Sequence, residues 1–123
     1  MKTLRILIVD DDALARRVLG DALAPLGCVV EEAKDGEEGI ARYRQARPDV
    51  VLLDLMMPNA SGLQTLEALR REDPTCRVVV VTSLEADSLR ASTRQAGAVG
   101  YVVKPFHPIE IRDAVERVLN TRA

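Results

Sequence analysis

The chain has 123 residues and a formal net charge of −2, with 47% hydrophobic and 29% charged residues. This length fits one domain, residues 1–123, with its own core. The slight negative charge argues against a protein held on nucleic acid by bulk charge. The two cysteines, Cys28 and Cys76, are expected to be reduced and buried. No apolar run is as long as a membrane span or a signal peptide requires, so we expect no membrane attachment and a cytoplasmic protein.

Five short apolar runs rich in Val, Ile and Leu recur along the chain with little alternation. This pattern is typical of strands buried on both faces of a parallel sheet. The predicted strands cover residues 4–9, 28–30, 50–53, 78–81 and 99–103.

The segments between these runs carry apolar residues at helical spacing, and Asp12 and Asp35 are predicted N-caps. The fourth helix, over residues 84–96, has a thin apolar side. Five strand–helix units in series predict a doubly wound α/β fold with five helices and right-handed crossovers. The apolar stripes of the other four helices are Leu14, Val18, Leu19, Ala22, Leu23 and Leu26; Ile40, Tyr43 and Ala46; Leu63, Leu66 and Leu69; and Ile111, Ala114, Val115 and Val118.

Polar and charged residues follow four of the five predicted strands. Asp10–Asp12 follow the first strand, Asp54 the third, Thr82 the fourth and Lys104 the fifth. Because parallel strands end at one edge of a sheet, we expect these side chains to gather where open α/β sheets bind ligands.

This set of side chains has a chemical meaning. Clustered carboxylates repel one another and favour a cation, and carboxylate and carbonyl oxygens suit Mg²⁺ or Mn²⁺. A carboxylate can also attack phosphorus, with a metal, an ammonium and a hydroxyl to stabilise the phosphoryl oxygens. We expect Asp54 to be this acceptor, since it ends the most apolar strand. Each residue alone would suit a solvated turn, a strand end or a surface charge; their joint placement makes that interpretation improbable.

Four motifs in order resemble the receiver domain of two-component response regulators and span nearly the whole chain. They are Ile8-Val9-Asp10-Asp11, Leu53 to Pro58 (LDLMMP), Val81-Thr82-Ser83 and Gly100 to Phe106 (GYVVKPF). The resemblance implies a flavodoxin-like fold with the strand order 2-1-3-4-5. One departure is Ser61, where many receivers carry an acidic residue.

By resemblance, Asp54 accepts a phosphoryl group from a histidine kinase or histidine phosphotransfer protein. Asp10, Asp11, Asp54 and the Met56 carbonyl are the expected Mg²⁺ ligands, Asp10 through water. Thr82 and Lys104 are expected to bind the phosphoryl group. Thr82 and Tyr101 are the expected switch residues, and the Lys104–Pro105 peptide is expected to be cis. The protein would catalyse only its own phosphorylation and dephosphorylation.

Phosphorylation is expected to rearrange the face formed by the fourth helix, the fifth strand and the fifth helix, with Arg90, Arg94, Arg112 and Arg117 exposed on it. That face would control a downstream protein or a missing output domain, as a monomer or a phosphorylation-dependent homodimer, without direct nucleic-acid binding. Met56 and Leu84 are apolar at positions that influence water access in this family, so slow autodephosphorylation is expected.

Three alternatives remain. A Mg²⁺-dependent aspartyl phosphotransferase of the haloacid dehalogenase kind would use Asp10 and Asp12 but leaves Asp54 unexplained. A flavodoxin-like cofactor domain needs a phosphate-binding loop where this chain has acidic residues. A receiver-like interaction domain that is never phosphorylated is disfavoured because Asp11, Asp54, Thr82 and Lys104 are all present.

Overall fold

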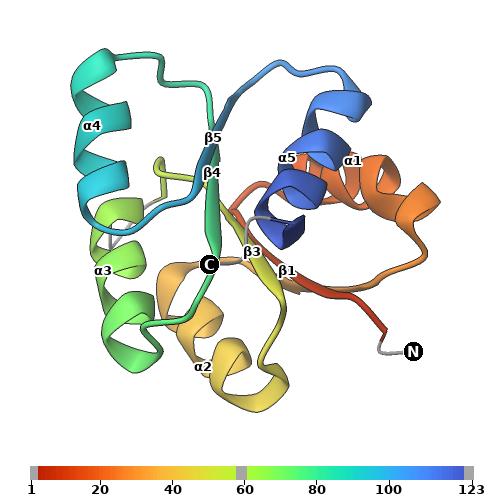
Figure 1. Cartoon of the computed structure of the whole chain (residues 1–123), viewed down its shortest axis with the longest axis horizontal. Helices are drawn as coiled ribbons and strands as arrows, with labels where there is room; N and C mark the ends of the chain where they lie inside the picture. Colours follow the sequence, from red (N-terminus) through yellow and green to blue (C-terminus); the bar gives the residue numbers. More distant parts are fainter. Residues whose placement is uncertain (1–2, 58–60, 121–123) are drawn as a thin grey trace.

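The computed structural model describes residues 3–57 and 61–120, so Pro58 of the third-strand motif lies outside the described residues. All five strands pair in parallel, in the order β2-β1-β3-β4-β5 (Figure 1), which confirms the predicted sheet and its order. The strands are β1 (Arg5–Val9), β2 (Val29–Ala33), β3 (Val50–Leu53), β4 (Val78–Thr82) and β5 (Gly100–Val103).

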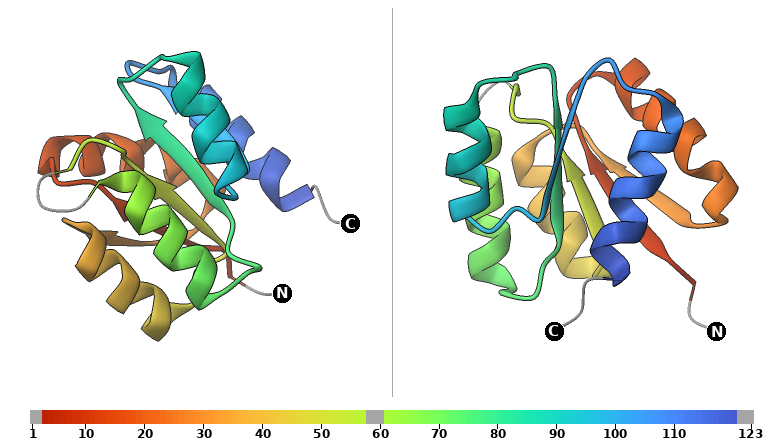
Figure 2. Two further views of the ribbon diagram at one scale, coloured as in Figure 1. Left: turned by 90° about the vertical axis from the view of Figure 1, so that its left-hand side faces the viewer. Right: turned by 45° about the horizontal axis from the view of Figure 1, so that its top comes forward.

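Helices cover both faces of the sheet, as a doubly wound fold requires. Figures 1 and 2 show α1 and α5 on one face and the other three helices on the opposite face. Within the described part of the chain, none of the helices combines the length and apolar character needed to cross a membrane. The helices are α1 (Ala13–Leu23), α2 (Gly36–Ala46), α3 (Gly62–Glu72), α4 (Asp87–Gln95) and α5 (Pro108–Asn120).

Alternate residues of each strand supply the two halves of the core. Ile6 and Ile8 of β1 pack toward α1 and α5, whereas Leu7 and Val9 pack toward the helices of the other face. β3 and β4 are buried at every position, as the unbroken apolar runs predict. Burying one such side chain contributes roughly 1.5–3 kcal/mol, so the sheet edge that carries the polar residues rests on a rigid base.

Asp12 and Asp35 cap helices as predicted. The Asp12 carboxylate accepts a hydrogen bond from the Leu14 backbone N–H, 3.0 Å, and that of Asp35 accepts one from Glu38, 2.8 Å. Ser61 and Gln64 form a reciprocal capping box at the start of α3.

Two predictions about the first helix are wrong in detail. It ends at Leu23, and residues Ala24–Leu26 form a 3-10 turn, because Pro25 has no N–H to continue the helical ladder. Leu14 and Val18, placed above on the apolar stripe of this helix, are 67% and 47% exposed. The buried face of α1 is narrower than the apolar periodicity indicates.

The fourth helix is as weakly anchored as its thin apolar side predicts. Of the residues in α4, Thr93 alone is buried, and its hydroxyl donates hydrogen bonds to the carbonyls of Leu89 and Arg90 inside the same helix. The N-cap residue, Ala86, offers no side-chain acceptor. Few buried contacts make such an element easy to displace.

Candidate functional site

Three aspartates meet at the edge of the sheet where its parallel strands end. The register pairs Val9 with Leu53, so Asp10 and Asp54 follow adjacent strand positions. One carboxylate oxygen from each of Asp10, Asp11 and Asp54 lies within 4.8 Å of the others. Asp10 and Asp54 are 1% and 7% exposed, whereas Asp11 faces solvent. The predicted carboxylate cluster is therefore present, with one member open to incoming groups.

Lys104 neutralises part of this cluster. Its Nζ donates hydrogen bonds to Asp10 Oδ2, at 2.8 Å, and to Asp54 Oδ2, at 3.1 Å. The Lys104 backbone N–H donates to the Thr82 carbonyl, 2.8 Å, which fixes the residue beside the end of β4. The Lys104–Pro105 peptide bond is cis. Three carboxylates against one ammonium leave the site with a net negative charge.

The pKa values of Asp10 and Lys104 are both raised, but for different reasons. Burial raises the pKa of Asp10 above 3.8, although hydrogen bonds from Lys104 and the Asp12 backbone oppose it. Burial alone would lower the pKa of Lys104, but the carboxylates of Asp10 and Asp54 outweigh it and raise that pKa above 10.5. Lys104 thus stays an ammonium at neutral pH.

Backbone groups orient the two buried carboxylates. Asp10 Oδ1 accepts from the Asp12 N–H, 2.9 Å, and Asp54 Oδ1 accepts from the Met56 N–H, 3.0 Å. Gly62 lies so close to Leu55 and the Asp54 carbonyl that a Cβ at this position would collide with both backbones. The start of α3 therefore packs directly against the backbone of Asp54 and Leu55.

Sequence reasoning missed Arg16 as a site residue. Its Nη1 donates to the Asp10 carbonyl, 2.6 Å, and its Nε pairs with Glu32, 2.8 Å. Arg16 therefore ties the acidic turn to α1 and β2. In the sequence, Arg16 is distinguished only by its position one helical turn after the N-cap residue Asp12, and this position does not indicate which groups it binds.

Thr82 and Tyr101 occupy different surroundings. Thr82 is fully buried, and its hydroxyl accepts a long hydrogen bond, 3.5 Å, from the Leu84 N–H. Tyr101 is half-buried, and its hydroxyl donates to the Leu84 carbonyl, 2.7 Å. The guanidinium carbon of Arg90 lies 4.5 Å from the centre of the Tyr101 ring. Leu84 thus connects the end of β4 to β5, and the Tyr101 ring connects β5 to α4.

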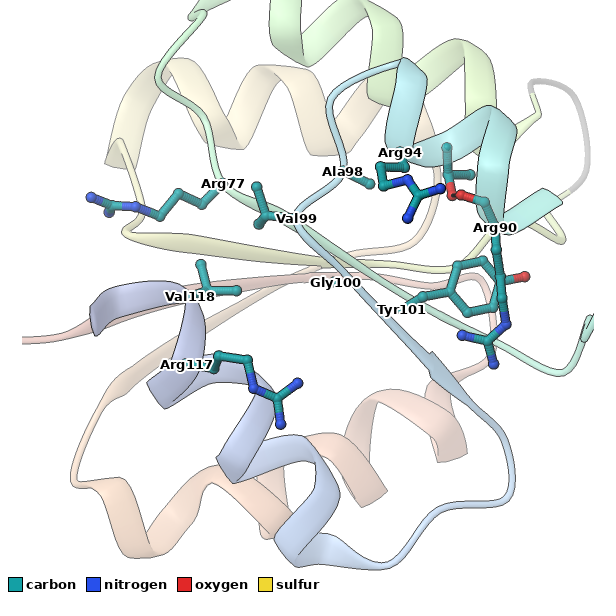
Figure 3. A pocket seen from close by; sticks show the side chains of 10 residues that line it. Arg77, Arg90, Arg94, Ala98, Val99, Gly100, Tyr101, Arg117 and Val118 are labelled. Atoms are coloured by element: carbon teal, nitrogen blue, oxygen red, sulfur yellow. Dashed lines mark hydrogen bonds between the residues drawn. The ribbon is translucent and has the colours of Figure 1, made fainter. Parts of the chain in front are cut away.

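A groove of about 570 Å³ lies over β5, between α4 and α5 (Figure 3). Arg90, Arg94 and Arg117 line it and are exposed, as predicted for this face. Arg112, expected on the same face, is half-buried, and its Nη1 donates to the Ala22 carbonyl, 3.0 Å, so this residue joins α5 to α1 instead.

A family model for the response regulator receiver domain matches residues 6–116, which include all of these site residues. The chain belongs to this family.

Relatives of known sequence align over nearly the whole chain. The chemotaxis protein CheY of Thermotoga maritima is 32% identical over 115 residues, covering 93% of this chain and 96% of the relative. CheY of Bacillus subtilis is 34% identical over 117 residues, covering 94% and 98%. The transcriptional regulatory protein ResD of B. subtilis is 36% identical over 94% of this chain, which spans 48% of ResD.

Solved structures of receiver proteins have the same fold as this chain. The receiver domain of the response regulator NarL from Mycobacterium tuberculosis has a TM-score of 0.90 and 31% identity, covering 99% of this chain and 100% of that one. A CheX–CheY–BeF3–Mg complex from Borrelia burgdorferi has a TM-score of 0.91 and 28% identity, covering 94% and 89%.

Family membership identifies the chain as a CheY-like receiver, a signalling phosphoacceptor rather than an enzyme acting on a separate substrate. The haloacid dehalogenase and flavin-binding alternatives are thereby set aside. The acidic cluster of Asp10, Asp11 and Asp54 with Lys104 is the part of the structure in which this chemistry resides.

Proposed function

We propose that Asp54 accepts a phosphoryl group from a histidine kinase or a histidine phosphotransfer protein. The observation that carries the proposal is the place of Asp54: its carboxylate is bound by Lys104 and lies within 4.8 Å of two further carboxylates at the sheet edge. Asp10 is less accessible to a donor than Asp54, at 1% against 7% exposed, and within the described part of the chain Lys104 pairs with Asp10 and Asp54 but not with Asp11. A cytoplasmic location is part of this proposal.

In the transfer, one Asp54 carboxylate oxygen forms a bond to phosphorus while the bond between phosphorus and the donor's imidazole nitrogen breaks. The electron pair of the broken bond stays on the imidazole, and the product is an aspartyl phosphate. The Lys104 ammonium and the Thr82 hydroxyl stabilise the phosphoryl oxygens, because a fixed charge and a fixed donor favour the developing negative charge.

The donor set suits Mg²⁺ or Mn²⁺. Asp10, Asp11 and Asp54 supply converging oxygens, and the Met56 carbonyl would add another. One ammonium neutralises only part of the charge of three carboxylates, which favours a divalent cation. A bound Mg²⁺ would supply Lewis-acid stabilisation of the phosphoryl oxygens. The Borrelia CheX–CheY–BeF3–Mg complex supports this assignment.

The phosphodonor is proposed to dock beside the acidic cluster on an apolar surface. Leu14 is 67% exposed in the first turn of α1, directly after Asp11 and Asp12. Ile109 is 50% exposed in the first turn of α5, the helix that packs beside α1. A helical donor carrying a phosphohistidine could cover both side chains while presenting phosphorus to Asp54.

Phosphorylation is proposed to act on Thr82 and Tyr101. When the Thr82 hydroxyl moves to the phosphoryl group, its hydrogen bond with the Leu84 N–H breaks. The segment around Leu84, which is hydrogen-bonded to Tyr101, is then released. The weakly anchored α4 then changes position with β5, which biases a two-state face toward a partner or an output domain.

The test is intact mass after incubation with acetyl phosphate, with and without Mg²⁺. We expect one added phosphoryl group in the wild type with Mg²⁺ and none in Asp54→Asn. Asp21→Asn, at an exposed aspartate of α1, is the matched control and should be phosphorylated like the wild type. A wild type that gains no mass would overturn the proposal and favour an interaction domain that works without phosphorylation.

A further inference from the structure

The thioether of Met56 is exposed beside the proposed phosphoryl acceptor. The Met56 side chain is 53% exposed, whereas Met57, the other methionine in the described part of the chain, is half-buried against the core on the α2 and α3 side of the sheet. The Met56 backbone N–H donates to Asp54 Oδ1, 3.0 Å, so this side chain starts next to the carboxylate. A polarizable sulfur atom is therefore open to solvent at the site.

The Met56 sulfur also lies between the two segments that flank the site. Its Sδ accepts a hydrogen bond, 3.4 Å, from the hydroxyl of Ser83, an exposed residue directly after β4. This contact joins the segment after β3, which begins with Asp54, to the segment after β4. A thioether is only a weak acceptor, so a chemical change that strengthens it would alter this part of the site.

The two cysteines are poor competitors for an oxidant. Cys76 is 2% exposed, and Cys28 is half-buried with its Sγ donating to the Leu23 carbonyl, 3.7 Å. Burial raises the pKa of both thiols above the usual 9.0, and the thiolate is the form that an oxidant attacks. Among the described residues, Met56 thus carries the sulfur most open to oxidation.

We propose that Met56 is an oxidation site for hydrogen peroxide and that its sulfoxide shortens the lifetime of the aspartyl phosphate. An electron pair of Sδ attacks one peroxide oxygen, and an S–O bond forms as the O–O bond breaks. The proton of the attacked hydroxyl passes to the departing hydroxide, which leaves as water. The sulfur is oxidised by two electrons and the peroxide is reduced. The proposal rests on the proposed function in one respect: the phosphoryl group concerned is the one on Asp54.

The sulfoxide would alter hydrolysis because it replaces an apolar group with a polar one that accepts hydrogen bonds. Its oxygen is bonded to the sulfur that already lies 3.4 Å from the Ser83 hydroxyl, and a second lone pair of that oxygen is available to water. A water held there is next to Asp54 and can attack the phosphorus. One additional hydrogen bond to this water corresponds to roughly fivefold faster hydrolysis.

The modification is reversible, which suits a regulatory role. Methionine sulfoxide reductases, one for each sulfoxide epimer, restore the thioether. The oxygen leaves as water, and a dithiol of the reductase becomes a disulfide. The exposure of Met56 makes its sulfoxide accessible to such an enzyme.

The first test maps the sites of oxidation. The wild-type protein is treated with hydrogen peroxide, and the sulfoxide at each methionine is quantified with time by fragment-ion mass spectrometry, which separates the adjacent Met56 and Met57. We expect Met56 to be oxidised several-fold faster than Met57. Equal rates, or faster oxidation of Met57, would overturn the proposal. This readout needs no phosphoryl group and is independent of the proposed function.

The second test measures the lifetime of the phosphoryl group. Oxidised and untreated proteins are phosphorylated with acetyl phosphate and Mg²⁺, and the loss of phosphorylated mass is followed after the donor is removed. We expect roughly fivefold faster loss in the oxidised protein and the untreated rate after incubation with both reductases. Met56→Leu has no sulfur at this position, so its rate should be the same before and after peroxide. Met57→Leu, the matched control, should respond to peroxide like the wild type.

The outcomes separate the two proposals. A peroxide effect that persists in Met56→Leu, or an oxidised Met56 with unchanged decay, would overturn the proposed oxidation control. A wild type that gains no phosphoryl group before peroxide would overturn the proposed function and with it the effect on lifetime. The map of oxidation would still decide whether Met56 is the reactive sulfur.

Discussion

Tyr101 is joined to Leu84 by a hydrogen bond of 2.7 Å from its hydroxyl to the Leu84 carbonyl, so one side chain of β5 holds the segment that follows β4. In the same segment, the Leu84 N–H donates to the Thr82 hydroxyl. The Arg90 guanidinium of α4 stacks on the Tyr101 ring. The proposed phosphoryl site and α4 are therefore linked through Leu84 and Tyr101. Binding at either end can bias the other only through a difference in affinity for the two arrangements.

Removing the Tyr101 hydroxyl should loosen this link. One hydrogen bond contributes about 1 kcal/mol, so in Tyr101→Phe we expect roughly fivefold faster amide hydrogen exchange at Leu84 and in the first turn of α4. Tyr43→Phe is the matched control, since the Tyr43 hydroxyl bonds Asp73, which ends α3. Equal exchange in Tyr101→Phe and the wild type would show that this bond does not hold the segment.

The sheet, its order and the carboxylate cluster could be predicted from the sequence because they depend on strong patterns. Unbroken apolar runs specify β3 and β4, and residues that follow parallel strands must share an edge. The edge strand was harder: β2 covers Val29–Ala33 rather than residues 28–30, because Glu31 and Glu32 lie in a strand with one open edge and mask its apolar signal.

Contacts between distant side chains could not be predicted in this way. The position of Arg16 in the sequence does not indicate that it binds Glu32 and the Asp10 carbonyl. The residues around Arg112 likewise do not indicate that its guanidinium donates to the Ala22 carbonyl. Leu14 and Val18 satisfy helical periodicity yet remain exposed, since periodicity gives a face and not the width of its partner surface.

Arg16 should position the acidic turn. Replacing a group that orients metal ligands typically lowers metal affinity by at least tenfold, so Arg16→Gln should bind Mg²⁺ about tenfold more weakly in calorimetric titration. Arg17→Gln makes the same charge change at an exposed neighbour and should bind like the wild type. Equal affinity in both variants would contradict a positioning role for Arg16.

Two adjacent aspartates should have opposite effects on stability without metal. Asp11→Asn removes a charge from a repulsive cluster and should raise the free energy of unfolding by roughly 0.5–1 kcal/mol in low salt with EDTA. Asp12→Ala removes the N-cap bond to Leu14 and should lower it by about 1 kcal/mol. Urea unfolding measures both changes. A less stable Asp11→Asn would show that the cluster is not dominated by repulsion.

Asp73 should make stability depend on acid pH. Hydrogen bonds from the Thr75 hydroxyl and N–H and from the Tyr43 hydroxyl lower the pKa of Asp73 from 3.8 to about 2. Because the folded-state pKa is the lower one, the stabilisation is complete above about pH 4 and is lost as the pH falls through about 2. Urea unfolding should therefore show a deficit for Asp73→Asn at pH 6 that shrinks by pH 3. A deficit for Asp73→Asn that does not change with pH would show that the effect does not come from titration of Asp73.

Met56 should govern how long an aspartyl phosphate survives. Its side chain is 53% exposed two residues after Asp54, and its Sδ accepts a hydrogen bond from the Ser83 hydroxyl, 3.4 Å, across the site. An apolar group there obstructs a water approaching in line with the phosphorus. In Met56→Asn a side-chain hydrogen bond of about 1 kcal/mol can hold that water, which corresponds to roughly fivefold faster hydrolysis. Loss of phosphorylated mass with time measures the rate of hydrolysis after acetyl phosphate is removed.

Val18→Asn, at an exposed apolar position of α1, is the control, and its phosphorylated form should decay at the wild-type rate. Equal decay in Met56→Asn would show that water reaches the phosphorus by a path that Met56 does not cover.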